Sequence, residues 1–269
     1  MKKQILLLVL SVFLSETLSA QFIDGDLSIG GGTVTGPVKK VTVTITQTHD
    51  PSDVLTTTAY FDTMGRITKT GVLRGEKEEI DGIYRYRDNS CVHYHYYSDD
   101  GKADDHFEKI FFDAEGREIM KFFYWQTTLT GVDSLVYDTQ GHLIAKYTSN
   151  YGERTPLLEK TYAYDSMDRI VEENNVKTGE RYTISYMPDG NYTKQITKSN
   201  GKKVTAIGTV NEAGQLVEEV IAKESKTRYL EYDKHGNWLK REGSMNSNSL
   251  WGRIGSVTER IIEYYGDIL

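Results

Sequence analysis

One turn-forming unit recurs along this 269-residue chain: an aromatic residue, then Asp-x-x-Gly, then a polar and an apolar residue. An Asp that opens a turn accepts a hydrogen bond from the backbone two residues on, and a Gly in fourth place supplies the positive φ that closes a hairpin with a bulge. Each copy therefore predicts a hairpin tip. The copies span Asp62–Gly65, Asp113–Gly116, Asp138–Gly141 and Asp233–Gly236, with a fifth that begins at Asp165 and has Asp168 in place of glycine.

Other turn signals fall between these tips, and the markers run through positions 141, 152, 168, 179, 190, 201, 214, 225 and 236. Steps of about 11 residues leave roughly 7 to 8 residues for each strand, which is typical of an up-and-down meander. Within the strands, residues alternate, so that Tyr182, Ile184 and Tyr186 point to one face. The predicted fold is all-β: an antiparallel β-meander of repeated hairpins forming a twisted or spiralling sheet.

The segments YAYDSMDRIVEENN and LEYDKHGNWLKREG resemble the YD repeats of the Rhs family, whose consensus is close to Tyr-x-Tyr-Asp-x-x-Gly-Arg-Leu. The end of the chain, GNWLKR…SVTERIIEYY, also resembles the end of short secreted proteins with Rhs-like repeats. The likeness covers roughly residues 59–269. It implies a long β-sheet that spirals. Large members close this sheet into a shell around a toxin domain, but this chain is too short for such a shell, so that function is not expected here.

The first 20 residues have the pattern of a secretory signal peptide: Lys2 and Lys3, a short apolar run, and Ala20 before the expected cleavage point. Residues 21–40 are rich in glycine and are expected to form a flexible leader. Residues 41–269 are then expected to form the YD-repeat-like β domain. This organisation predicts a protein exported to the periplasm, the cell surface or the medium.

Composition limits the classes of partner. The net charge is −7 and no long basic stripe is present, which argues against nucleic-acid binding. After the signal peptide no segment is apolar enough to form a transmembrane helix. Cys91 is the single cysteine, so stability is expected to come from packing and backbone pairing without an internal disulfide. The sequence leaves the oligomeric state open.

A histidine-rich segment, residues 91–110, holds the candidate metal ligands His93, His95, His106 and Glu108. If Asp100-Gly101 forms a two-residue turn, His95 lies opposite His106 and His93 opposite Glu108, all on one face. Imidazole and carboxylate groups arranged in this way suit zinc or a similar cation. The alternative is a row of polar residues on a wetted sheet face, and a register slip of one residue removes the site. Another tight turn is predicted at Asp81-Gly82.

The aromatic residues allow two interpretations. Tyr94, Tyr96, Trp125 and Trp238 are candidate binding residues for a sugar or a protein partner. The same side chains suit cross-strand packing equally well.

The sequence contains no GxSxG, HExxH or P-loop motif, and the tip aspartates are explained by their turns. We therefore expect a non-enzymatic secreted repeat protein without a cofactor, which contacts a protein or a glycan through an exposed sheet face. Two alternatives stay open: a closed β-barrel that carries a small ligand, and a metal-dependent enzyme at the histidine cluster. An outer-membrane barrel is disfavoured, because the turn spacing leaves short strands.

Overall fold

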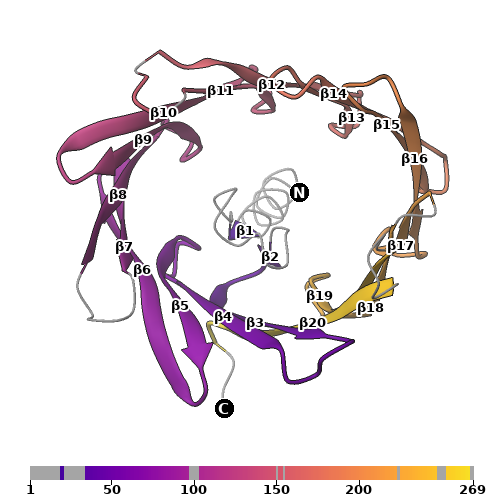
Figure 1. Cartoon of the computed structure of the whole chain (residues 1–269), viewed down its shortest axis with the longest axis horizontal. Coiled ribbons are helices and arrows are strands. Elements are labelled where there is room, and N and C mark those ends of the chain that lie inside the picture. Colours follow the sequence, from indigo (N-terminus) through magenta and orange to yellow (C-terminus); the bar gives the residue numbers. More distant parts are fainter. Residues whose placement is uncertain are drawn as a thin grey trace, which may run out of the picture. The chain divides into compact units, whose positions relative to one another are not determined.

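The computed structural model describes residues 19–20, 34–96, 103–149, 151–153, 155–222, 225–246 and 253–266. The regular elements within these ranges are β-strands (Figure 1). Across the same ranges, no helix is long and apolar enough to cross a membrane. Residues 1–18 of the predicted signal peptide and residues 21–33 of the predicted leader lie outside the described residues. The end of the leader is not irregular, because it forms β2 and the start of β3.

The strands follow one another with short connections. In the first third of the chain they are β1 (Ser19–Ala20), β2 (Val34–Thr35), β3 (Val38–Gln47), β4 (Val54–Phe61), β5 (Ile67–Arg74), β6 (Lys77–Arg87) and β7 (Ser90–Tyr96). The middle third contains β8 (Ala103–Phe112), β9 (Glu118–Trp125), β10 (Thr128–Tyr137), β11 (Leu143–Thr148), β12 (Leu157–Tyr164) and β13 (Ile170–Asn175). The last are β14 (Glu180–Tyr186), β15 (Tyr192–Thr197), β16 (Lys203–Val210), β17 (Leu216–Ile221), β18 (Ser225–Tyr232), β19 (Trp238–Asn246) and β20 (Arg253–Tyr264).

The eighteen strands from β3 to β20 form a closed antiparallel barrel, because the last strand pairs with the first. Pairing of β20 with β3 runs from Ser256↔Gln47 to Tyr264↔Val38. The open or spiralling meander predicted from the repeat is therefore wrong. An open sheet would leave β3 and β20 each with a row of unpaired backbone groups, and joining these two edges satisfies them.

Contacts divide the chain into two compact units. The first contains residues up to Ile80 together with Leu230–Arg241 and the segment from Ser256 onward. Its core lies on the pairs Val41↔Ala59 and Val43↔Thr57 of β3 and β4, where all four side chains are buried. Full burial of the two valine side chains stabilises by roughly 1.5–3 kcal/mol each.

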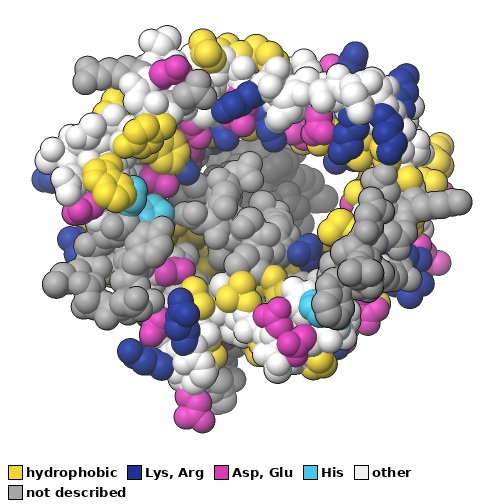
Figure 2. Space-filling model, in the orientation of Figure 1, with side chains coloured by type: hydrophobic (Ala, Val, Ile, Leu, Met, Phe, Trp, Pro, Cys, Tyr) yellow, Lys and Arg dark blue, Asp and Glu magenta, His cyan; other side chains and the backbone are white. Residues whose placement is uncertain are grey.

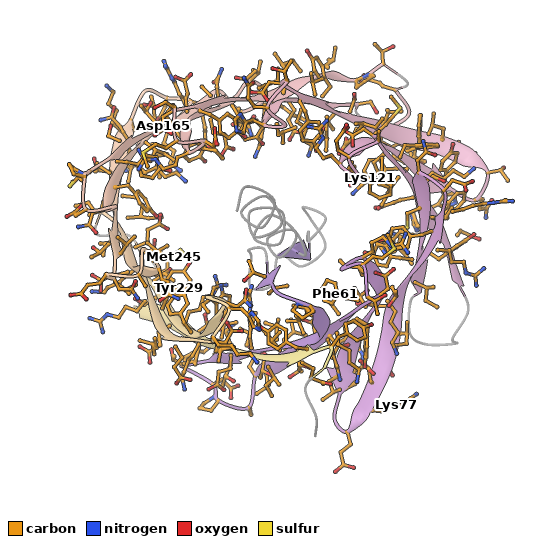
Figure 3. The ribbon with its side chains drawn as sticks, turned by 180° about the vertical axis from the view of Figure 1, so that it is seen from behind. Phe61, Lys77, Lys121, Asp165, Tyr229 and Met245 are labelled. Carbon is orange, nitrogen blue, oxygen red and sulfur yellow. The ribbon has the colours of Figure 1, made fainter. Side chains whose placement is uncertain are left out.

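The second unit contains Asp81–Tyr229 and Glu242–Gly255. Its strands pair with their sequence neighbours from β7 to β18 in the meander order that the turn spacing predicted. Residues on alternate positions share a face. Cys91 and Ile110, which are direct partners, are almost fully buried on one face. Lys121 points toward the concave side of this curved sheet (Figure 3).

The tips have the hydrogen bonds that the Asp-x-x-Gly unit implies. Asp113 Oδ1 accepts from the backbone N–H groups of Glu115 (3.1 Å) and Arg117 (2.9 Å), and Gly116 has a φ of +80°. At three tips the aromatic residue before the turn pairs with an apolar residue after it, as Phe61↔Ile67, Tyr137↔Leu143 and Tyr164↔Ile170. At the Asp113 tip the partner of Phe112 is Glu118. The other tips, which open at Asp62, Asp138, Asp165 and Asp233, use the same Asp-to-backbone bonds and have positive φ at Gly65 (+75°), Gly141 (+93°), Asp168 (+61°) and Gly236 (+82°).

One predicted turn is wrong. Asp81 and Gly82 lie inside β6, with Gly82 paired to His95, and the chain turns instead near Gly75 (φ +65°) and Asp88 (φ +52°). The Asp-Gly pair lies within a run of alternating strand residues. A turn there would break the backbone hydrogen bonds that β6 forms with its neighbours, so the strand continues through the pair.

Candidate metal centre

Three of the four predicted ligands come together on the second unit. His93 and His95 are alternate residues of β7, so both side chains point to the same face of the sheet. Glu108 on β8 is the direct cross-strand partner of His93. Because opposed residues of an antiparallel pair have their Cβ atoms only about 5 Å apart, the pairing alone brings the three groups together. Their ligand atoms lie within 4.8 Å of one another.

Glu108 lies between the two imidazoles. Its Oε2 is 3.4 Å from Nδ1 of His93, and its Oε1 is 3.5 Å from Nε2 of His95. The His93 side chain is 3% exposed and the His95 side chain 27%, so solvent reaches the cluster from the His95 side. Tyr84, the cross-strand partner of His93 on β6, stacks on its ring with centroids 4.0 Å apart and fixes its orientation.

A cation already faces this carboxylate. Lys121 Nζ on β9 lies 3.7 Å from Oε2 of Glu108 and 3.8 Å from Oε1 of Glu118. Burial would raise the pKa of Glu108, but hydrogen bonds with His93 and His95 and the Lys121 charge hold it well below its ordinary value. Burial dominates at Glu118, whose pKa is raised. Glu108 is therefore the ionised acceptor of the cluster.

The charged row continues along the same face on β10 to β12. Lys146 Nζ lies 3.6 Å from Asp133 Oδ2 and 3.3 Å from Glu159 Oε2, and Thr148 donates a 2.6 Å hydrogen bond to Glu159. Burial would lower the pKa of Lys146, but the two carboxylates raise it above its ordinary value. Figure 2 shows acidic and basic side chains interspersed among hydrophobic ones on the side of the molecule that it displays. Each of the two lysines, Lys121 and Lys146, thus lies between two carboxylates.

His106, the fourth predicted ligand, is not part of the cluster. The β7–β8 register shifts between Tyr94 and Tyr96, and the register of β8 with β9 pairs His106 with Trp125. Their rings meet edge to face, with centroids 3.9 Å apart. The predicted Asp100-Gly101 turn, on which the pairing of His95 with His106 depended, lies outside the described residues.

The candidate binding aromatics occupy different environments. Tyr94 lies on the face opposite the histidines, 6.2 Å from the ring of Phe107, which stacks on Tyr124 at 4.8 Å. Trp125 is 42% exposed. Trp238 is buried in the first unit, beneath the guanidinium of Arg260 at 3.5 Å. For Tyr96 the structure gives the strand position alone.

Two residues of the centre were missed from the sequence, namely Lys121 and Tyr84. The aromatic residues near Lys121 and Tyr84 indicate that both lie on β-strands. Their position beside the histidines, however, follows from the register of β8 with β9 for Lys121 and of β6 with β7 for Tyr84. A sequence signal was present in the period-2 alternation of YRYR and CVHYH, which predicts one face for Tyr84 and Tyr86 and one for the histidines.

Two imidazoles and a carboxylate form a three-ligand set of the kind that binds zinc-like ions and leaves a further position open. Ligand atoms around a tetrahedral zinc ion stand about 3.3 Å apart, as follows from bond lengths of about 2.0–2.1 Å. The separations of 3.4 and 3.5 Å between Glu108 and the two imidazoles fit that spacing. The residues present therefore suit such an ion.

The fold defines the class: this is an all-β protein whose strands close into an antiparallel barrel. No protein-family model matches the chain. No curated protein matches it either.

Among solved structures, a porin-like protein from Bacteroides uniformis is similar, with a TM-score of 0.47 and 11% identity over 86% of this chain and 99% of that one. A porin-like protein from Bacteroides vulgatus has a TM-score of 0.36 at 12% identity, over 86% of this chain and 99% of that one. The TcdB2-TccC3 complex has a TM-score of 0.39 and 12% identity, over 81% of this chain and 14% of that one. At these similarities the likenesses assign neither a family nor a function to this chain.

Proposed function

We propose that this chain is an exported, non-enzymatic β-barrel that carries a small amphipathic ligand on one face of its sheet. The observation that supports this proposal is the closure of the strand order through β20 and β3. A sheet without free edges does not recruit a partner strand, so recognition falls to side chains on its faces.

The two faces of the second unit differ in chemistry. The face of Lys121 continues along the sheet through direct pairs and through residues two positions apart on one strand. The direct pairs are Lys121↔Asp133, Lys146↔Lys160 and Glu173↔Tyr182. Asp133 connects to Lys146 through Leu135, and Lys160 connects to Glu173 through Asn175. On β14 to β16 that face consists of three cross-strand rows, which are Tyr182↔Ile196↔Val204, Ile184↔Lys194↔Ala206 and Tyr186↔Tyr192↔Gly208. The opposite face carries small polar side chains in the row Thr183↔Gln195↔Thr205.

The aromatic rows hold their rings in fixed places. Tyr192 lies over Gly208, where an added Cβ would meet ring carbons at 2.1 Å, and its hydroxyl donates a 2.7 Å hydrogen bond to Glu219. Lys194 Nζ lies 4.6 Å from the centre of the Tyr182 ring. Rings, aliphatic side chains and fixed polar groups on one surface suit a ligand with a flat apolar part and hydrogen-bonding groups.

A lipid-facing barrel fits the described strands less well. A transmembrane barrel needs one continuous apolar face, and a charge at mid-membrane depth costs about 2–4 kcal/mol. In the second unit the Tyr182 face carries Lys160 and Glu173, which form a 2.9 Å ion pair. The opposite face carries Glu172 and Arg181, 2.6 Å apart. The proposal is therefore a carrier in an aqueous compartment.

The repeat relationship belongs to the same proposal. The tips that open at Asp113, Asp138 and Asp165 share the aromatic residue before the Asp, the turn, and a basic residue after it, as in Rhs-like YD units. We propose that the chain is a short Rhs-like repeat protein in which this unit builds a carrier.

The experiment compares two neighbouring residues of β14 that face opposite sides. The purified mature chain is titrated with a dansyl-labelled fatty acid, alongside the variants Tyr182→Ala and Thr183→Ala. The proposal predicts saturable binding that Tyr182→Ala weakens about tenfold, the loss of roughly one aromatic contact, whereas Thr183→Ala leaves it unchanged. A folded wild-type chain without saturable binding, or equal losses in both variants, contradicts the carrier.

A further inference from the structure

We propose that His93, His95 and Glu108 bind one zinc-class divalent ion, and that Lys121 is a built-in competitor that moves from Glu108 to Glu118 when the ion binds. This inference stands independently of the ligand carrier, because the cluster lies on β7 to β9 and the rows of that proposal lie on β14 to β16.

The first support is the register. His93 and Glu108 are direct cross-strand partners, and His95 follows His93 by two residues. The arrangement therefore follows from backbone pairing and needs no loop to position any ligand. Sites built on strands hold their geometry better than sites built on loops.

The second support is the separation of the ligand atoms. Each oxygen of Glu108 faces a different imidazole nitrogen, at 3.4 Å for His93 and 3.5 Å for His95. These separations are long for a hydrogen bond, whose N···O distance is usually about 2.7–3.2 Å, so the two contacts with Glu108 are weak ones that an ion can replace. The separations match ligands that share one ion.

The third support is the fixed orientation of the buried ligand. The His93 ring is clamped between Tyr84, with ring centroids 4.0 Å apart, and His95, at 4.1 Å. A metal-binding imidazole that is held by packing loses little freedom when the ion arrives. His95, the more exposed of the two, gives the ion its route of entry.

Lys121 sets the conditions for binding. Its Nζ lies 3.7 Å from Glu108 Oε2. The ammonium therefore forms an ion pair with the carboxylate that the metal ion would bind, and the two cations compete for it. Glu118 Oε1, at 3.8 Å, offers the ammonium a second carboxylate on its own strand. When the ion takes Glu108, the ammonium is repelled and keeps a partner by moving to Glu118, so that neither carboxylate is left unpaired.

The ligand set selects the class of ion. Two imidazoles with one carboxylate favour Zn²⁺, Co²⁺, Ni²⁺ or Cu²⁺, whereas Mg²⁺ and Ca²⁺ prefer a set made of oxygen atoms. The proposal therefore predicts binding of Zn²⁺ with one ion per chain and no competition from Mg²⁺.

The test is calorimetric titration of the tag-free mature chain with Zn²⁺, in the presence of Mg²⁺. His95→Ala is expected to weaken binding by more than about 100-fold, since even outer-shell partners of metal ligands contribute about 10–100-fold. His106→Ala is the matched control, because it removes a histidine of the neighbouring strand that packs on Trp125 outside the cluster. Lys121→Met is expected to tighten binding about tenfold by removing the competing charge.

A second readout does not depend on variants. Co²⁺ bound to the wild-type chain is expected to give the intense visible absorption of a four- or five-coordinate site. Weak absorption of the octahedral type overturns the proposal, as does a folded wild-type chain that binds no Zn²⁺. Equal weakening by His95→Ala and His106→Ala overturns it as well. An affinity unchanged in Lys121→Met overturns the competitor role.

Discussion

The guanidinium of Arg169 lies over the ring of Tyr186, 4.1 Å from its centre, and joins one hairpin tip to the next. Arg169 is held by Asp165 of its own tip, through bonds of 2.9 Å from Nε and 2.7 Å from Nη2. The Tyr186 hydroxyl donates to the carbonyl of Ile170, just after Arg169. The turn, the basic residue and the tyrosine thus form one interlocking unit.

The same step occurs twice more along the edge of the second unit. Arg117 lies 4.7 Å from the ring of Tyr137, and His142 stacks on Tyr164 at 4.5 Å. In both steps the tyrosine hydroxyl donates to a backbone carbonyl of the earlier hairpin, that of Glu118 or Leu143. This relationship explains why tyrosine, aspartate, glycine and a basic residue recur together.

Replacing Arg169 tests the interlock. Arg169→Ala removes a ring contact and two bonds to Asp165, and is expected to lower the free energy of unfolding by about 1 kcal/mol, given the partial exposure of the pair. Urea unfolding of the mature chain measures the change. Arg181→Ala, which breaks the exposed pair with Glu172, is the control and should cost about 0.5 kcal/mol or less. Equal losses would show that the stacking on Tyr186 adds nothing.

The tip glycines are required for their backbone conformation. Gly116 has a φ of +80° and no atom within 4 Å of an added Cβ, so Gly116→Ala tests conformation without a steric clash. The substitution is expected to cost about 1–2 kcal/mol, because residues with a Cβ resist the left-handed region. Ala114→Ser in the same turn is the control. Differential scanning calorimetry that finds the two variants equally stable would refute the turn role of Gly116.

The side chain of Asn237, at a tip of the first unit, bonds to the backbone of β2. Its Oδ1 accepts from Thr35 N–H at 2.7 Å and its Nδ2 donates to Thr35 C=O at 2.9 Å, which fixes β2 to the tip. Asn237→Ala leaves both backbone groups without these partners and is expected to cost about 2–3 kcal/mol. Asn89→Ala, in the exposed turn between β6 and β7, should be nearly neutral. A small effect of Asn237→Ala in chemical denaturation would argue against the anchor.

The tip carboxylate at Asp233 is expected to make stability depend on pH. Burial would raise its pKa, but hydrogen bonds from Tyr264 and Asn237 lower it below the ordinary value of 3.8. A depressed pKa means that the stabilisation is present above 3.8 and is lost as the pH falls through the folded-state value. The wild-type chain should therefore have a larger free energy of unfolding than Asp233→Asn at neutral pH. The difference between the two should become smaller below about pH 4. A difference in free energy of unfolding that stays constant or grows in acid would show that the Asp233 carboxylate does not cause the pH dependence.

The hairpin turns were predictable because the residues that determine each turn lie within the turn itself. Tyr137 and Leu143 flank a turn whose residues set both its type and the pairing of its neighbours. The Asp81-Gly82 motif failed, because a strand of 11 residues runs through it. Short turn motifs compete with ladder bonds that are not visible in the motif itself.

Three features could not come from the sequence, because each depends on how strands pair and not on a local turn motif. His106 left the predicted metal cluster through a register shift near Tyr96, and a slip of this kind changes which side chains meet. Lys121 entered the cluster from β9, one strand further on. Barrel closure pairs residues such as Thr42 and Ile261, which are more than 200 positions apart, and no hairpin signal encodes that contact.

The most direct test of barrel closure is a disulfide between β3 and β20. Thr42 and Ile261 are cross-strand partners, so Thr42→Cys with Ile261→Cys in a Cys91→Ser background places two thiols within bonding reach. Closure predicts that the monomer forms this disulfide under mild oxidation, while the slipped pair Thr42→Cys with Ile262→Cys, on opposite faces, does not. Non-reducing electrophoresis and peptide mass mapping give the result. A Thr42/Ile261 pair that stays reduced, or crosslinks no better than the slipped pair, contradicts the closed barrel.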